Sequence, residues 1–423
     1  MRAIVYPAKL KGEQVAPASK SSMQRACAAA LLHKGETVIH NPGHSNDDLA
    51  ALDVIQKLGA QVATGTTYIK VVSKGVQPIG PAMNCGESGL GIRMFTPIAA
   101  LSNQAITIQG KGSLLKRPMH FFDEIFPSLG ITIQSQAGFL PIQIQGPLQP
   151  ATIEVDGSLS SQFLTGLLMA FAAAEATSHV IHVKDLKSKP YIDLTLSVLN
   201  AFGWKVTHQN YEQFAFMQHA PLPEKIEYTV EGDWSGAAFL LVAGAIAGPI
   251  KVKGLQMDST QADKAVMQAL LSANAKITYQ ANDIIMEANP NGLTAFSFDA
   301  TDCPDLFPPL VALAAVCNGI TEIKGVSRLA HKESDRGLTL QTEFAKLGIK
   351  IVLEGDIMKI HGGTSIKSNT VFSQHDHRIA MACGVAALVA DGPIEITEAE
   401  AINKSYTDFF THLMHLGARV DVL

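Results

Sequence analysis

The 423-residue sequence lacks the features that mark membrane, secreted and metal-binding proteins. No apolar run reaches the ~18 residues that a bilayer-spanning helix requires. The basic start is not followed by the long apolar segment and cleavage site of a secretory leader. The five cysteines show no CxxC or other metal-ligand spacing, which favours buried free thiols. From these absences we expect a cytoplasmic protein that binds neither a membrane nor a metal.

An excess of positive charge is also missing. The chain has 33 basic and 38 acidic residues, a net charge of −5, and only 17% of its residues are charged. This composition gives no electrostatic reason to expect a nucleic-acid partner. Any anionic small molecule must therefore be bound by a local arrangement of polar groups. The length of the chain favours two large domains.

A repeat of about 70 residues runs through the whole sequence. Six segments have the pattern of an amphipathic helix that ends at a turn residue and continues as a strand. The turn residues, 69 to 74 positions apart, are Gly59, Gly130, Gly203, Asn274, Gly348 and Gly417. Glycine and asparagine best tolerate the left-handed conformation that closes a helix. The sequence therefore predicts six equivalent structural units.

A second series has the same period. In each repeat a polar cluster leads into an almost wholly apolar run, and the markers are Ser21, Ser88, Ser161, Ser235, Asp305 and His377. An apolar helix without a polar face is enclosed on all sides. We therefore predict an α/β protein of six βαβαββ units, arranged as two similar domains of three units in an inside-out, barrel-like fold. If the enclosed helices of a domain run parallel, their N-termini share a face that favours anions.

Taken singly, each polar cluster has an ordinary structural explanation. The residues around Lys20 can be a serine helix cap with solvent-facing cations, Asp305 can be a cap, and residues 332–336 can be a salt-bridged helix start. His375 and His377 are two positions apart and have no third ligand nearby, which argues against a metal site. Recurrence of the clusters at equivalent points of five or six repeats favours a shared anion-binding function instead.

These clusters resemble the motifs of the 5-enolpyruvylshikimate-3-phosphate synthases, and the resemblance covers essentially the whole chain. The matching stretches are Lys-Ser-x-x-x-Arg at 20–25, Ser-Ser-Gln at 160–162, Ser-Lys-Pro-Tyr at 188–191, Lys-Glu-Ser-Asp-Arg at 332–336 and Asp-His-Arg at 376–378. The resemblance implies one domain of residues 19–231 and a second of residues 1–18 plus 232–423, with the active site in the cleft between them.

The resemblance also implies the reaction. The enolpyruvyl group of phosphoenolpyruvate is transferred to the 5-hydroxyl of shikimate-3-phosphate by addition and elimination, with release of phosphate. This step belongs to the shikimate pathway to chorismate and the aromatic amino acids. No cofactor is implied, and we expect a monomer.

The family's binding residues can be carried over to matching positions. Shikimate-3-phosphate is then held by Ser21, Arg25, Ser160, Ser161, Gln162, Ser188, Tyr191, Asp305 and Lys332. Phosphoenolpyruvate contacts Lys20, Gly89, Arg117, Gln162, Arg336, Arg378 and Lys404. As a hypothesis, Asp305 assists removal of the hydroxyl proton and Glu333 exchanges the proton at C3 of the enol. Lys20 is a further acid–base candidate.

Two stretches depart from the family pattern. Residues 17–20 read Pro-Ala-Ser-Lys where Pro-Gly-Asp/Ser-Lys is usual, and residues 87–90 read Glu-Ser-Gly-Leu where Asn-Ala/Ser-Gly-Thr is usual. Leu90 lacks the threonine hydroxyl, and Glu87 adds a carboxylate near the expected phosphate site. We therefore expect an altered affinity for phosphoenolpyruvate and for its competitor glyphosate.

Two other functions fit the same general pattern. An enzyme that transfers the enolpyruvyl group to a UDP-N-acetylhexosamine is expected to have Lys-Asn near the start of its sequence. It should also have a cysteine in a mobile loop, which corresponds to residues 112–118 here. Here Ser21 follows Lys20, and residues 112–118 contain no cysteine. A non-catalytic anion-binding protein would need the cations but neither Asp305 nor Glu333.

Overall fold

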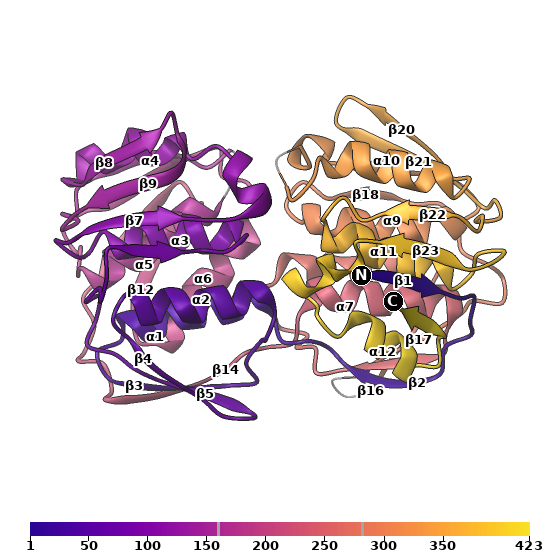
Figure 1. The fold of residues 1–423 in the computed structure, drawn as a ribbon, viewed down its shortest axis with the longest axis horizontal. Coiled ribbons are helices and arrows are strands. Elements are labelled where there is room, and N and C mark those ends of the chain that lie inside the picture. Colours follow the sequence, from indigo (N-terminus) through magenta and orange to yellow (C-terminus); the bar gives the residue numbers. More distant parts are fainter. Residues whose placement is uncertain (159–160, 281–282, 331) are drawn as a thin grey trace. The chain divides into compact units, whose positions relative to one another are not determined.

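The computed structural model describes residues 1–158, 161–280, 283–330 and 332–423. The chain forms two compact units (Figure 1). The continuous unit is Lys20–Val230, and the split unit combines Met1–Ser19 with Glu231–Leu423. The chain therefore passes between the units twice.

Three four-stranded sheets form the continuous unit. They are β14 (Lys225–Thr229), β3 (Glu36–His40), β5 (Tyr68–Val72) and β4 (Gln61–Thr64); β6 (Ala82–Asn84), β7 (Ala105–Gln109), β9 (Phe139–Gln145) and β8 (Thr132–Gln136); and β10 (Ile153–Asp156), β11 (Val180–Lys184), β13 (Gln213–Met217) and β12 (Lys205–Gln209). In each, in this order, the first two strands are parallel and the other neighbours antiparallel.

The split unit repeats this arrangement. Its sheets are β2 (Gly12–Val15), β15 (Ile250–Lys253), β17 (Asp283–Glu287) and β16 (Lys276–Gln280); β18 (Ser297–Asp299), β19 (Gly319–Lys324), β21 (Ile357–Gly362) and β20 (Lys350–Glu354); and β22 (Thr370–Phe372), β23 (Ile394–Thr397), β1 (Arg2–Val5) and β24 (Val420–Val422). The same order of one parallel and two antiparallel pairings recurs in all three.

Each unit encloses three apolar helices, as the sequence predicts. They are α1 (Lys20–Leu32), α3 (Gly89–Ala99) and α5 (Ser161–Ala173) in the continuous unit, and α7 (Trp234–Ala247), α9 (Phe307–Val316) and α11 (His377–Ala387) in the split unit. Within each unit these three helices pack against one another. In α7 every residue except Ile246 is buried. Inner strands such as β9, β11 and β21 bury alternate residues, so their sheets turn one face inward and the other outward.

The amphipathic helices end where the turn residues predict. They are α2 (Asn46–Lys57), α4 (His120–Ile125), α6 (Lys189–Ala201), α8 (Val266–Ser272), α10 (Arg336–Lys346) and α12 (Phe409–His415). All six turn residues have positive φ, from 61° at Asn274 to 105° at Gly59. The expected second helix is interrupted, because Pro127 has no N–H to continue α4 and the chain proceeds as the 3-10 helix η2 (Phe126–Leu129).

The predicted fold class is confirmed, with one difference in how the units are completed. The sheet of the first repeat takes its parallel edge strand from β14, about 190 residues beyond β3 in sequence. Likewise, β2 completes the fourth sheet and β1 the sixth. All five cysteines are buried and unbridged, as expected. No helix within the described ranges is both long and apolar enough to span a bilayer.

Candidate active site

In the continuous unit, predicted site residues lie where the enclosed helices begin. Lys20, Gly89 and Ser161 are the first residues of α1, α3 and α5. Ser88 caps α3, accepting a hydrogen bond from the N–H of Gly91 at 2.9 Å. The Ser88 hydroxyl also donates to Oε1 of Gln24 in α1 at 3.0 Å. These contacts join the starts of α1 and α3.

Gly89 lies beside two other expected binding residues of this unit, Arg117 and Gln162. A Cβ atom at this position would lie 2.5 Å from Nη1 of Arg117 and 3.7 Å from Oε1 of Gln162. Arg117 follows the 3-10 helix η1 (Gly112–Lys116) and is 7% exposed. A larger residue here would require the Arg117 guanidinium to shift. The structure therefore brings together Gly89, Arg117 and Gln162, which lie far apart in sequence.

Arg25 organises a second part of this unit from a fully buried position. Its Nε donates to Thr195 Oγ1 at 2.9 Å, its Nη1 to the carbonyl of Ser21 at 2.8 Å, and its Nη2 to the carbonyl of Tyr191 at 3.2 Å. Burial lowers the pKa of Arg25 to about 10, so it stays charged at neutral pH. Two other predicted binding residues, Ser21 and Tyr191, are thus held by one guanidinium.

Of the two remaining predicted serines, the structure describes Ser188. Ser188 precedes α6 and is buried, with φ 57° in the left-handed region that non-glycine residues seldom adopt. Such strain at a helix start is typical of functional positions. Ser160 lies outside the described residues.

Two residues near this cluster escaped the sequence interpretation. Arg93, one turn into α3, donates from Nη1 to the carbonyl of Gly89 and to Gln162 Oε1, both at 3.2 Å. Asp47 in α2 accepts a 3.0 Å contact from Lys20 Nζ, and its side chain is 5% exposed. A single arginine inside an otherwise apolar run was a usable signal for the first. Asp47 had none, because acidic residues at a helix start usually serve as caps.

In the split unit, Asp305 is surrounded by three cations. Its Oδ1 lies 3.1 Å from Lys332 Nζ and 2.7 Å from Arg336 Nη1, and its Oδ2 lies 3.2 Å from Arg378 Nη2. Burial raises the pKa of Asp305, but the attraction of Arg378, Lys332 and Arg336 outweighs it and holds the pKa well below its usual range. Burial lowers the pKa of Lys332, against the opposing effect of Asp305.

Arg336 is the centre of the charge network and is 1% exposed. Besides Asp305, its guanidinium contacts Glu333 and donates from Nε to Asp376 Oδ2 at 2.7 Å. Although burial lowers the pKa of Arg336, the carboxylates of Asp376, Glu333 and Asp305 raise it overall. Lys404 Nζ lies 3.9 Å from Glu333 Oε1.

Two aspartates of the motifs are structural partners. Asp376 is fully buried, caps α11 by accepting from the N–H of Arg378 at 3.0 Å, and holds Arg336. The sequence interpretation gave Asp376 no role. Asp335 caps α10 by accepting from the N–H of Leu338 at 3.2 Å. Asp376, the cap of α11, thus holds both the guanidinium of Arg336 and the backbone N–H of Arg378.

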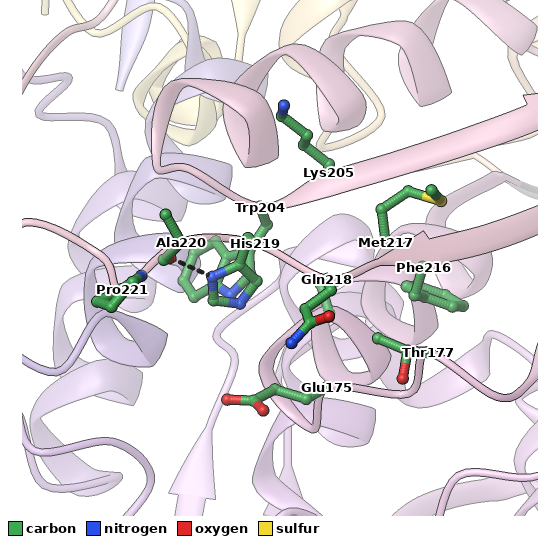
Figure 2. Close-up of a pocket in the computed structure, with 11 residues that line it drawn as sticks. Glu175, Thr177, Trp204, Lys205, Phe216, Met217, Gln218, His219, Ala220 and Pro221 are labelled. Atoms are coloured by element: carbon green, nitrogen blue, oxygen red, sulfur yellow. Dashed lines mark hydrogen bonds between the residues drawn. The ribbon is translucent and has the colours of Figure 1, made fainter.

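A pocket elsewhere in the continuous unit contains none of these residues. Figure 2 shows that it is lined by Trp204 and Phe216, whose rings are buried, and by the ionisable residues Glu175, Lys205 and His219. Its ionisable residues are not joined in a charge network like that around Arg336. Among the described residues no group of three or more His, Cys, Asp or Glu side chains could hold a metal. His375 and His377 instead face Glu398 and Asp376 at 2.7 and 3.7 Å.

Six βαβαββ units with cations and carboxylates clustered near helix starts define an α/β protein of two similar three-sheet units. The family model for EPSP synthase (3-phosphoshikimate 1-carboxyvinyltransferase) matches residues 4–413. The chain belongs to this family.

The relatives extend over the full length of the chain. The 3-phosphoshikimate 1-carboxyvinyltransferase of Clostridium botulinum (strain Alaska E43 / Type E3) is 36% identical, covering 98% of this chain and 96% of the relative. That of Aeropyrum pernix is 34% identical, with coverage of 100% and 97%. A solved EPSP synthase from Acinetobacter baumannii superimposes with a TM-score of 0.82 at 25% identity over 100% of both chains.

An enolpyruvyl transferase from Streptomyces tendae has the same fold, with a TM-score of 0.79 at 16% identity over 99% of this chain and 98% of its own. The family membership establishes the activity. The protein is a transferase that moves the enolpyruvyl group of phosphoenolpyruvate to shikimate-3-phosphate in the shikimate pathway. Its substrates are small molecules.

Proposed function

We propose that Asp305 and Glu333 carry the proton transfers of this reaction and that the cations around them bind the substrate anions. The observation that supports this assignment is the convergence of both carboxylates on Arg336, with Asp305 at 2.7 Å. A group that holds both proton-transfer residues can align them on one reacting centre. The planar guanidinium forks of Arg336 and Arg378 suit carboxylate and phosphate groups.

Binding of shikimate-3-phosphate is assigned to groups of both units. Ser21, Arg25, Ser160, Ser161, Gln162, Ser188 and Tyr191 come from the continuous unit, and Asp305 and Lys332 from the split unit. Phosphoenolpyruvate is assigned to Lys20, Gly89, Arg117, Gln162, Arg336, Arg378 and Lys404. The domains of residues 19–231 and of 1–18 with 232–423 therefore act on one pair of substrates.

Asp305 becomes an effective base only when substrates bind. With three cations around it, its pKa is held low, and a carboxylate of low pKa is a weak base. Substrate anions that pair with Arg336 and Arg378 offset the positive charge around Asp305. Its pKa then rises, and it can take the proton of the 5-hydroxyl as the oxygen attacks C2 of the enol.

Glu333 is assigned to the proton at C3, which is added in the first step and removed when phosphate leaves. Lys404, 3.9 Å away, keeps this carboxyl near a positive charge. Lys20, held by Asp47 at 3.0 Å, is the acid–base candidate at the bridging oxygen. Each positioned proton transfer contributes roughly 10² to 10⁴-fold to the rate.

Exchange of solvent deuterium into C3 of phosphoenolpyruvate separates the two roles. With shikimate-3-phosphate present, Glu333→Gln should slow exchange at least as much as turnover. Asp305→Asn should slow formation of the tetrahedral adduct. Exchange at the wild-type rate in Glu333→Gln would remove Glu333 from the C3 step and leave the family's activity untouched.

A monomeric state and a cytoplasmic location complete the proposal. Light scattering of the purified protein at several concentrations tests the first, and fractionation of the source cells tests the second. Transfer to a UDP-N-acetylhexosamine is disfavoured because Ser21 follows Lys20 and residues 112–118 lack a cysteine. A purely anion-binding role leaves the arrangement of Asp305 and Glu333 around Arg336 without a purpose.

A further inference from the structure

Glu87 joins two turns of the continuous unit that are otherwise 26 residues apart in sequence. It stands directly before Ser88, the cap of α3. The turn itself is fixed, because the N–H of Gly86 donates to Asn84 Oδ1 at 2.9 Å and that of Ser88 to the carbonyl of Cys85 at 3.0 Å. The side chain of Glu87 therefore leaves the α3 turn in a set direction.

The second turn leads to Arg117. Its residue Lys111 donates from its backbone N–H to the carbonyl of Gly86 at 2.7 Å. The N–H of Ser113 donates to Oε2 of Glu87 at 3.4 Å. A Cβ atom on Gly112 would lie 2.5 Å from either carboxylate oxygen of Glu87, and Gly112 has φ +53°. The carboxylate is thus packed directly on the backbone of this turn, and only glycine permits that contact.

The same short helix carries Arg117 at its other end. Arg117 follows η1 directly, with its N–H bonded to the carbonyl of Leu114 at 3.2 Å. Leu114 is fully buried, so η1 is anchored in its middle. The Arg117 guanidinium returns to the α3 turn at Gly89. One end of η1 is therefore held by Glu87, and the other delivers Arg117 to the residue two positions after Glu87.

We propose that Glu87 is a positioning residue for phosphoenolpyruvate, acting through η1 to hold the Arg117 guanidinium at Gly89. This inference rests on the proposed role of Arg117 in binding phosphoenolpyruvate. A carboxylate does this better than a neutral amide, because its hydrogen bond from a backbone N–H is charge-assisted. It also explains how a chain with Glu87, where Asn is usual in the family, keeps a phosphate site next to an added negative charge.

Steady-state kinetics of three variants test the proposal. Glu87→Ala should raise the KM for phosphoenolpyruvate about tenfold, the effect expected for loss of a charge-assisted hydrogen bond. The kcat and the KM for shikimate-3-phosphate should stay within about twofold of the wild type. Glu87→Gln, whose amide oxygen can still accept from Ser113 but without charge assistance, should recover part of the affinity. Glu124→Ala, at an exposed position of α4 in the same unit, is the matched control.

The route through Arg117 is tested by combining substitutions. In an Arg117→Ala background, Glu87→Ala should cause no further rise in KM, because the group that it positions is gone. A further tenfold rise would mean that Glu87 acts on substrate directly, which overturns the inference. If Glu87→Ala does not fold, Gly112→Ala, which places a methyl group against the carboxylate, should raise the KM for phosphoenolpyruvate in the same way.

The binding role of Arg117 and the positioning role of Glu87 can be overturned separately. A raised KM in Arg117→Ala with a wild-type KM in Glu87→Ala overturns the positioning role and leaves the proposed role of Arg117 standing. A wild-type KM in Arg117→Ala removes that proposed role, and the inference about Glu87 with it. A selective KM effect in Glu87→Ala that Glu87→Gln partly reverses supports both.

Discussion

Arg336 Nη1 lies 2.7 Å from Asp305 Oδ1, and the same guanidinium is bonded to Asp376 at 2.7 Å. One carboxylate is fully buried as the cap of α11, whereas the other stands at the start of α9 with its side chain 21% exposed. The two carboxylates therefore have different roles. Asp376 fixes the cation, and Asp305 can exchange its contacts with a substrate.

Asp305→Asn should lower kcat by about 10² to 10⁴-fold, because the amide cannot accept the hydroxyl proton. The KM values should change less, since Lys332, Arg336 and Arg378 stay in place. Asp302→Asn removes the same charge three residues away at an exposed position and should retain full activity. A kcat within threefold of the wild type in Asp305→Asn would exclude it as the base.

Glu333→Gln should lose activity mainly in kcat. The amide keeps the size of the side chain, so substrate binding is largely preserved while the proton at C3 can no longer be exchanged. Initial rates at saturating and limiting phosphoenolpyruvate separate the two parameters. A normal kcat would remove the assignment of Glu333 to that step.

Asp376→Ala should destabilise the split unit by about 3–5 kcal/mol, because it leaves the buried charge of Arg336 without its buried partner. Urea unfolding measures the difference. Asp421→Ala breaks the exposed pair with Arg419, which solvent screens, and should cost far less. Equal losses in the two variants would contradict the network described around Arg336.

Gly89→Ala should raise the KM for phosphoenolpyruvate at least about tenfold, because the new Cβ would lie 2.5 Å from Nη1 of Arg117. Its unfolding temperature should change little, since the guanidinium can shift. Gly80→Ala meets no atom within 4 Å and serves as the control with wild-type kinetics. An unchanged KM in Gly89→Ala would show that Arg117 is not needed at that place.

Asp48 should make the continuous unit less stable as the pH rises. Burial raises the pKa of Asp48 to about 6, although hydrogen bonds from Ser45 oppose the rise. The folded state therefore binds this proton more tightly than the unfolded chain, whose aspartate pKa is about 3.9. Its stabilising contribution is complete below pH 3.9 and is lost as the pH rises through about 6.

The difference between the pKa values of Asp48 in the folded and unfolded states corresponds to about 3 kcal/mol of unfolding free energy, at 1.36 kcal/mol per pH unit. Urea unfolding of the wild type and Asp48→Asn at pH 4 and pH 7 measures it. The wild type should lose about that much relative to Asp48→Asn over this range. Parallel stability curves for the two proteins would show that Asp48 does not titrate in it.

The repetitive part of the fold could be predicted because its signals are local. Gly59 and Asn274 mark helix ends by conformation alone, and the apolar run of α7 excludes any solvent-facing side. The pairing of β14 with β3 had no such signal, because strands about 190 residues apart are joined by tertiary packing and not by local sequence.

Among the site residues, recognition depended on polarity standing out from its surroundings. Lys332 and Glu333 did so. Arg93 also stood out in its apolar run, but no role was inferred for it, and Asp376 resembled an ordinary cap. Like Asp47, which holds Lys20, Arg93 and Asp376 hold other site residues in place. Their role depends on contacts with Gln162 and Arg336, which only the folded chain brings near.

Release of phosphate from phosphoenolpyruvate, measured with each candidate acceptor, is the decisive test of enolpyruvyl transfer to shikimate-3-phosphate. The account predicts release with shikimate-3-phosphate, accompanied by an equal amount of the enolpyruvyl product by mass spectrometry, and loss of both in Asp305→Asn. No release with shikimate-3-phosphate, or release with a UDP-N-acetylhexosamine in its place, would contradict it.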